Sequence, residues 1–235
     1  MTCPVCHFPM NGSGVGLLRR DILPGDYRFG TEGEPGEDVH YVRCRHTPEA
    51  VRRAYFKSSG LLESDAGQSL WPMAGREEAL RALEHLAGSA GGMLALHGGF
   101  GTGKSFMLKW LVDRCISRQR KAVYVPMAEL LDTLRSTFQD GAAETFSKAF
   151  ENVQTASVLA IDELDKWAGT DWAQDKVFQL LDWRYRRSDK LLTAVAYNEP
   201  ASVPPYILSR LFEHCVVDLG SKDLRPAVGE EEMAF

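Results

Sequence analysis

Five short apolar runs, rich in β-branched residues, mark the second half of the chain. They lie at residues 92–98, 122–126, 157–163, 191–198 and 215–219. Short continuous apolar runs are typical of strands that are buried on both faces of a sheet. The pattern therefore predicts five buried strands.

Segments with helical periodicity separate these runs. Within residues 103–118, for example, Met107, Leu111 and Cys115 recur at every fourth position. Residues 127–156 hold two helical segments, where a simple strand–helix–strand unit would have one. Strands that alternate with helices predict an α/β fold, with a five-stranded parallel sheet between layers of helices.

The chain before residue 90 has a different pattern. Residues 1–47 are rich in Gly and Pro, with scattered β-like runs such as DVHYVRC, and a helical pattern begins at Thr47 and Pro48. A second amphipathic helix, REEALRALEHLAG, ends near Gly88. We expect an N-terminal module at 1–57, a linker at 58–75 and an α/β domain at 76–235.

Composition narrows the class of protein. The chain has 235 residues, of which 44% are hydrophobic and 25% charged, as in ordinary globular proteins. No apolar run approaches the roughly 18–20 residues needed to cross a bilayer, and no signal-peptide core is present. We therefore expect a cytoplasmic protein without a membrane partner. Because the net charge is −5, any nucleic acid would have to bind a local basic patch.

The turn after the first predicted strand fits the phosphate-binding pattern GxxxxGK[ST] in full, between a strand and a helix. Its glycines allow backbone N–H groups to face phosphates, and the helix N-terminus adds partial positive charge. Lys104 is expected to reach the β- and γ-phosphates of ATP, and Ser105 to bind Mg²⁺. The alternative is a glycine-rich turn without a ligand. The motif consists of Gly98, Gly99, Phe100, Gly101, Thr102, Gly103, Lys104 and Ser105.

Two acidic residues follow the third predicted strand. Asp162 ends the apolar run SVLAID and Glu163 comes next. We expect this strand to lie beside the phosphate-loop strand, with Asp162 in the Mg²⁺ shell and Glu163 polarising an attacking water. Alternatively, both acids cap the next helix. Together with the phosphate loop, they favour an ATPase.

The order of these motifs resembles the AAA+ ATPases, specifically the bacterial helicase loaders of the DnaC/DnaI type and the related IstB transposition helpers. The resemblance spans roughly residues 90–226. It implies a Mg²⁺-dependent ATPase core without the C-terminal helical lid that many AAA+ proteins carry. It rests on GGFGTGKS, VLAIDELDKW, LLDWRYRRSDKLLTAVAYNEP and PYILSRLFEHCVVDLGSKDLRP.

The resemblance implies three further nucleotide-site residues. Asn198 matches sensor 1, near the γ-phosphate, although a strand-ending turn residue is the alternative. Arg210 matches the arginine finger, which reaches the ATP of a neighbouring subunit and so implies a homo-oligomer; a surface arginine is the alternative. Arg225 resembles a terminal arginine that touches nucleotide. In the family, the extra helix within residues 127–156 contributes to a path for single-stranded DNA, where Arg135 and Lys148 either serve or form a solvated helix face.

The cysteines indicate a metal site. In a cytoplasmic chain, five cysteines favour thiols or metal ligands over disulfides. Cys3, Cys6, Cys44 and His46 form two close pairs that predict a zinc-ribbon-like N-terminal module with a Cys₃His site. His7 or His40 can replace His46, and unliganded thiols are the alternative. We expect Cys115 and Cys215 to pack in the core.

Three functions follow. The first is an ATP-dependent loader of a hexameric replicative helicase onto single-stranded DNA in DNA replication; some loaders carry an N-terminal zinc module that contacts the helicase. The second is an ATPase helper of DNA transposition, like IstB. The third is a zinc-dependent adaptor that binds nucleotide without turnover.

Overall fold

The computed structural model describes residues 15–19, 27–29, 39–44, 47–68, 75–138, 145–166 and 170–224, the strands before residue 45 by their backbone only. Its largest element is a five-stranded sheet whose neighbouring strands are all parallel, in the order β5-β6-β7-β4-β8. The predicted α/β sheet of five strands is therefore confirmed. The strands are β4 (Gly92–His97), β5 (Ala122–Pro126), β6 (Val158–Asp162), β7 (Leu192–Tyr197) and β8 (Cys215–Asp218).

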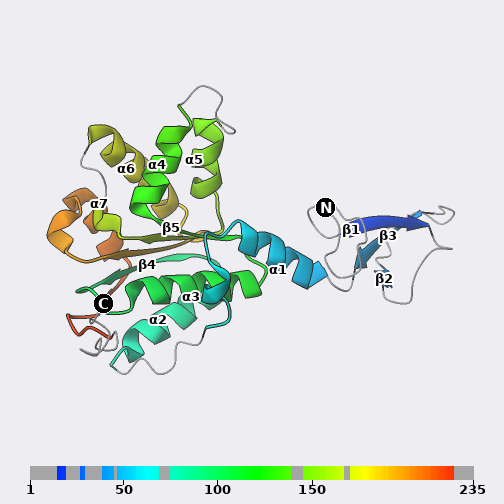
Figure 1. Ribbon diagram of the computed structural model, residues 1–235, viewed down its shortest axis with the longest axis horizontal. Coiled ribbons are helices and arrows are strands. Elements are labelled where there is room, and N and C mark those ends of the chain that lie inside the picture. The colour runs from blue at the N-terminus through cyan, green and yellow to red at the C-terminus, as the bar shows by residue number, and fades with distance from the viewer. Residues whose placement is uncertain are drawn as a thin grey trace, which may run out of the picture.

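Alternate residues of each strand supply two separate cores, one on each face of the sheet. In β4, Leu94 and Leu96 belong to one buried cluster, whereas Met93 and Ala95 belong to the other. Successive side chains of a strand point to opposite faces, so continuous apolar runs bury both. Figure 1 shows a helical layer on each side of the sheet. One layer holds α2 (Glu77–Gly88) and α3 (Lys104–Ser117), and the other holds α4 (Met127–Ser136), α5 (Phe146–Gln154), α6 (Asp171–Tyr185) and α7 (Pro205–Phe212).

One expectation about strand order is wrong. The strand that carries Asp162, β6, does not lie beside the phosphate-loop strand β4, because β7 pairs with both of them. The hydrophobic pattern could not reveal this order, since strands buried on both faces look alike in sequence. The consequence is that the end of β7 lies between the phosphate loop and the acids.

The two remaining cysteines differ in environment. Cys115 on α3 is fully buried, as expected, and burial raises the pKa of its thiol. Cys215 is exposed, so the expectation that it packs in the core is wrong. It lies in β8, which is an edge strand of the sheet, and only one side of β8 has a neighbouring strand.

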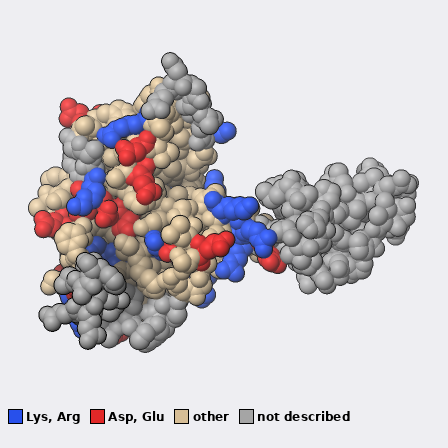
Figure 2. All heavy atoms as spheres, in the orientation of Figure 1, with Lys and Arg blue, Asp and Glu red and all other residues tan. Residues whose placement is uncertain are grey.

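Helix α1 (Thr47–Lys57) has one apolar and one basic side. Tyr55 and Phe56 pack against the cluster on the α3 side of the sheet. Arg52, Arg53 and Lys57 are exposed, and Figure 2 shows Lys and Arg side chains gathered over this part of the molecule. The helix therefore docks on the α/β core through its aromatic side chains.

A separate antiparallel sheet precedes α1. Its strands are β1 (Val15–Arg19), β2 (Tyr27–Phe29) and β3 (Val39–Cys44), in the order β1-β3-β2. The predicted β-like run DVHYVRC is thus a strand in its last six residues. Three one-turn helices complete the described elements, namely η2 (Glu63–Asp65), η3 (Leu164–Lys166) and η4 (Pro200–Ser202). In the described part of the chain, each helix is too short or too polar to cross a bilayer.

Candidate functional site

The turn between β4 and α3 has the backbone conformation that its glycines predict. Gly101 and Gly103 have φ values of +69° and +92°, in the left-handed region that side chains with a Cβ rarely adopt. A Cβ on Gly101 would also lie 1.8 Å from Oδ1 of Asp223. Glycine is thus required here both for the turn and for close packing of the segment after β8.

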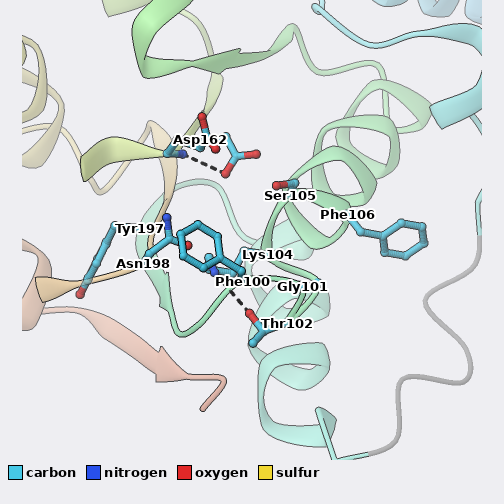
Figure 3. A pocket seen from close by; sticks show the side chains of 11 residues that line it. Phe100, Gly101, Thr102, Lys104, Ser105, Phe106, Asp162, Tyr197 and Asn198 are labelled. Atoms are coloured by element: carbon cyan, nitrogen blue, oxygen red, sulfur yellow. Dashed lines mark hydrogen bonds between the residues drawn. The ribbon is translucent and has the colours of Figure 1, made fainter. Parts of the chain in front are cut away.

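Lys104 is folded onto this turn. Its Nζ donates hydrogen bonds to the carbonyl oxygens of Gly98 at 2.6 Å and Gly99 at 2.7 Å. It also donates one to Thr102 Oγ1 at 3.3 Å, which Figure 3 shows. Burial lowers the pKa of Lys104 below its ordinary value, while the nearby carboxylate of Asp162 acts in the opposite direction. The ammonium group lies in the concavity where a bound phosphate would compete with the carbonyls for its protons.

Ser105 lies in the first turn of α3 and is exposed. The first amide groups of a helix have no partners within it, and they carry partial positive charge. A phosphate group at this point would meet N–H donors, the Lys104 ammonium and the Ser105 hydroxyl. The local chain is therefore suited to bind polyphosphate.

Asp162 ends β6 and is 4% exposed. Its Oδ1 accepts a hydrogen bond from the backbone N–H of Glu163 at 2.9 Å, and its Oδ2 accepts one from the hydroxyl of Tyr124 at 2.8 Å. Both carboxylate oxygens are thus oriented. Sequence reasoning did not single out Tyr124, because it lies 38 positions away on a different strand.

Glu163 has an unusual backbone conformation, with φ of +49°. A left-handed conformation in a residue other than glycine costs about 1–3 kcal/mol, and such strain is often found at functional sites. The side chain is exposed, and it lines the same cavity as the phosphate loop. This position is compatible with the expected contact with water.

Asn198 follows β7 and so lies between the loop and the acids. Its side-chain N–H₂ donates a hydrogen bond to Oδ2 of Asp165 at 3.2 Å. Asp165 belongs to η3, immediately after the two acids, and was not foreseen as a site residue. The only sequence signal for it was the third acid in the run DELD.

These groups surround one cavity of about 310 Å³. Phe100, 67% exposed, stands at its edge, and Figure 3 shows Phe106 pointing away from the other labelled side chains. The structure thus brings together the loop, both acids and Asn198, which are far apart in sequence. The lining residues are Phe100, Gly101, Thr102, Gly103, Lys104, Ser105, Phe106, Asp162, Glu163, Tyr197 and Asn198.

Comparison with known families identifies the fold and the site. Residues 94–219 match the family described as ATPase family associated with various cellular activities (AAA). The match covers 126 of the 235 residues, and it contains the loop, both acids and Asn198. The chain belongs to the AAA family.

Helicase loaders and DnaA are among the proteins with similar sequence or structure. Over 105 residues the chain is 29% identical to the replicative helicase loader DnaI of Bacillus subtilis (strain 168), a match that covers 45% of this chain and 32% of DnaI. The DnaC helicase loader structure aligns with 72% of this chain and 99% of its own, at 16% identity and a TM-score of 0.53. AMPPCP-bound DnaA from Aquifex aeolicus aligns with 62% of this chain and 46% of its own, at 16% identity and a TM-score of 0.55.

The structural matches show the same fold, and the chain spans about a third of the curated relative that it matches. Membership in the AAA family supports nucleotide binding and ATP hydrolysis.

Arg210 of this AAA protein is not in the cavity. It lies on α7, where its Nε donates a hydrogen bond to Oδ1 of Asp182 on α6 at 2.8 Å. The guanidinium also stands 5.1 Å from the ring centre of Phe178. Its side chain is 27% exposed, and the hydrogen bond from Arg210 lowers the pKa of Asp182. The Arg210 guanidinium is thus hydrogen-bonded to Asp182 of the same chain.

The segment after β8 packs against the phosphate loop. Gly99 N–H donates to the carbonyl of Gly220 at 2.7 Å, and Leu224 N–H donates to the carbonyl of Gly101 at 2.9 Å. Arg76, just before α2, donates to the carbonyl of Lys222 at 3.2 Å and was also missed by sequence reasoning. Arg225 lies outside the described residues, so its contact with nucleotide remains a prediction.

The expected zinc ligands lie largely outside the described part of the chain. This holds for Cys3, Cys6 and His46, and of Cys44 only the backbone position at the end of β3 is described. Within the described ranges, no three His, Cys, Asp or Glu side chains are grouped to hold a metal ion. The Cys₃His site therefore remains a prediction.

Proposed function

We propose that this AAA protein is an ATP-dependent loader that places a hexameric replicative helicase on single-stranded DNA. Two observations support this proposal: one cavity is lined by the phosphate loop, both acids and Asn198, and a stretch of 105 residues is 29% identical to a replicative helicase loader. The structural likeness to the DnaC helicase loader supports the same fold.

Residues of this chain can carry out each step of ATP hydrolysis. Loop amides and Lys104 bind the β- and γ-phosphates, and they stabilise the negative charge that spreads over the oxygens during transfer. Glu163 accepts a proton from the attacking water, as a general base. Asn198, held by Asp165, orients that water or the γ-phosphate through its amide.

The donor set fits Mg²⁺. This ion is usually held by one or two carboxylates and a hydroxyl together with substrate phosphates, rather than by a cage of protein ligands. Asp162, with both oxygens oriented, and the exposed Ser105 hydroxyl would hold it. When bound, Mg²⁺ would offset phosphate charge.

Arg210 would complete the site of a neighbouring subunit in a homo-oligomer. Its bond to Asp182 keeps the guanidinium oriented and partly exposed until a neighbouring phosphate competes for it. An arginine that acts in trans would make hydrolysis depend on assembly. The free subunit would then hydrolyse ATP slowly.

A cluster of aromatic and basic side chains supports binding of single-stranded DNA. Phe138, 63% exposed, stacks on Phe146 with ring centres 5.2 Å apart, and Trp172 meets both rings. Arg135 lies over Trp172 and Lys176 over Phe146, each at 5.4 Å from the ring centre. Aromatic faces beside cations are the usual platform for unpaired bases. Of the two basic residues expected here, Arg135 joins this cluster, whereas Lys148 is simply exposed on α5.

The N-terminal region is the proposed contact with the helicase. A Cys₃His zinc site would stabilise a segment that is rich in Gly and Pro. Metal analysis of the purified full chain should find about one zinc per chain, and chelation should weaken helicase binding without loss of nucleotide binding. Absence of zinc from freshly purified protein would count against the module.

The test of the loader proposal is reconstitution. The full chain is mixed with the replicative helicase of the same genome, and co-elution, loading onto circular single-stranded DNA and phosphate release are measured. The proposal expects a complex, ATP-dependent loading and faster hydrolysis when DNA is present. Co-elution with a transposase instead of the helicase would favour the transposition helper.

The third function, a nucleotide-binding adaptor, makes a different prediction. It expects tight binding of ATP with no phosphate release, even with helicase and DNA present. The strained Glu163 at the cavity favours turnover instead, because strain without a functional benefit would only reduce stability.

A further inference from the structure

The segment that joins α1 to the ATPase core is fastened to the edge of the sheet. The carbonyl of Ser59 accepts a hydrogen bond from the N–H of Tyr124 in β5 at 2.7 Å, and Ser59 is fully buried. Gly60 has φ of +77°, and a Cβ there would lie 2.2 Å from the carbonyl oxygen of Tyr124. Leu61 joins the buried cluster that contains Tyr124. A residue with a side chain at position 60 would therefore clash with β5 and prevent this segment from packing there.

Further contacts bind the same segment to α3. The Nζ of Lys109 lies 3.2 Å from Oδ1 of Asp65, and the N–H of Gly67 donates to Oδ2 of Asp113 at 3.0 Å. Lys109 and Asp113 are both on the helix that begins in the phosphate loop. Residues 58–67, called here the docking segment, thus bridge β5 and α3.

Tyr124 connects this docking segment to the nucleotide site. Its backbone N–H binds Ser59, while its hydroxyl donates to Oδ2 of Asp162 at 2.8 Å. The other oxygen of Asp162 is already engaged by the N–H of Glu163. Tyr124 is only 8% exposed, so its ring has little freedom to move apart from β5.

We propose that Tyr124 is a positioning residue for Asp162 and that its position depends on the docking segment, so that the N-terminal region adjusts Mg²⁺-nucleotide binding. This inference rests on the proposed role of Asp162 in holding Mg²⁺. The residues that orient a metal-binding carboxylate affect metal affinity about 10- to 100-fold. A partner that pulls on the N-terminal region would loosen residues 58–67, shift β5 and turn the Asp162 carboxylate.

The first test removes only the hydroxyl group. In the full chain, Tyr124→Phe keeps the buried ring, and binding of fluorescently labelled AMPPCP is titrated with Mg²⁺. We expect the Mg²⁺ concentration for half-maximal binding to rise about 10-fold or more, while nucleotide affinity in EDTA stays within about 2-fold of the parent. A purely structural role would alter both affinities alike. An unchanged Mg²⁺ dependence would overturn the assignment.

The second test loosens the docking segment. Gly60→Val should raise the same Mg²⁺ midpoint and expose residues 58–67 to proteolysis, because its side chain meets the Tyr124 carbonyl. Gly75→Val is the matched control, since Gly75 also has a positive φ, +78°, but lies outside residues 58–67, and a Cβ there has no neighbour within 4 Å. In the Tyr124→Phe background, Gly60→Val should add less than about 2-fold, because both changes act through one hydroxyl. Full additivity would overturn the coupling.

The outcomes separate this inference from the proposed function. If the parent chain binds no labelled AMPPCP, the ATPase proposal itself fails. If the parent binds it with a normal Mg²⁺ dependence and Tyr124→Phe matches the parent, only the role of Tyr124 fails. If Tyr124→Phe shifts the midpoint and Gly60→Val does not, the docking segment is not connected to the site.

Discussion

Glu163 is one of two residues other than glycine with a positive φ in the described part of the chain. It directly follows a regular strand, yet its φ of +49° turns its side chain out of the sheet while Asp162 stays buried. Two neighbouring acids thus differ in burial, and acids in different environments can have different roles. The buried acid is oriented by two hydrogen bonds, and the exposed one is accessible to water.

Replacing Glu163 by Gln tests this division. Phosphate release by Glu163→Gln should fall about 10²- to 10⁴-fold, because the amide cannot accept the proton of the attacking water. Binding of labelled ATP should persist, since the loop and Lys104 are unchanged. Hydrolysis equal to that of the parent would contradict the role of Glu163. Glu199→Gln, at another exposed acid, is the control and should leave the rate unchanged.

At this scale, sequence predicted the residues that act through local motifs. The loop, Asp162 and Glu163 were recognisable from local motifs that follow a strand, whereas Asn198 was expected only from the family resemblance. Tyr124 and Asp165 were not recognisable, because their importance lies in hydrogen bonds to Asp162 and Asn198 across the sheet. Those partners depend on the order of the strands.

Among the elements, α5, α6 and β7 are held together by one buried arginine. Arg184 is fully buried, and it donates hydrogen bonds to Thr193 Oγ1 and to the carbonyls of Gln154 and Ala156 at 2.8–2.9 Å. Burial lowers the pKa of Arg184 to about 9, which leaves it charged at neutral pH. Arg184 belongs to the stretch LLDWRYRRSDKLL, one of the stretches that carry the family resemblance. At this position the resemblance therefore concerns the stability of the fold.

We expect Arg184→Met to lower the free energy of unfolding by about 3–5 kcal/mol, since several buried oxygens would lose their donor. Urea denaturation of the full chain measures this change. Arg187→Met is the control, because Arg187 is exposed and should change stability by about 1 kcal/mol or less. Equal effects of the two substitutions would contradict the role of Arg184 in holding α5, α6 and β7 together.

The helices α4, α5 and α6 also present the aromatic cluster proposed for DNA. Phe138→Ala should weaken binding of single-stranded DNA by about 1–3 kcal/mol, the usual loss for one stacking base. Fluorescence anisotropy with a labelled oligonucleotide at fixed salt measures it. Leu62→Ala removes a side chain that is similarly exposed, at 66%, and should have no effect. If both variants bind like the parent, DNA lies elsewhere.

At the scale of the whole molecule, the site is proposed to be shared between subunits. Lys104→Ala and Arg210→Ala should each reduce hydrolysis in the helicase-bound assembly, the latter by about 10³-fold or more. When the two variants are mixed, about a quarter of randomly assembled sites would combine an intact loop with an intact arginine. Activity should therefore reappear in the mixture. If mixing restores nothing, Arg210 does not act in trans.

The number and sequence order of the strands in the α/β core, and their alternation with helices, could be read from the chain alone. Buried strands and amphipathic helices are selected by local hydrophobic periodicity, and the phosphate loop needs glycines at fixed spacing. These features depend on neighbours within a few residues of the sequence, so they can be predicted without knowing the fold.

Strand order and the long-range contacts required the folded chain. Only the placement of β7 between β4 and β6 brings Asn198 to the acids, and only the packing of residues 58–67 on β5 connects Tyr124 to both Ser59 and Asp162. The physical reason is that strands buried on both faces are interchangeable in hydrophobic pattern. Their arrangement is selected by the packing of the whole core.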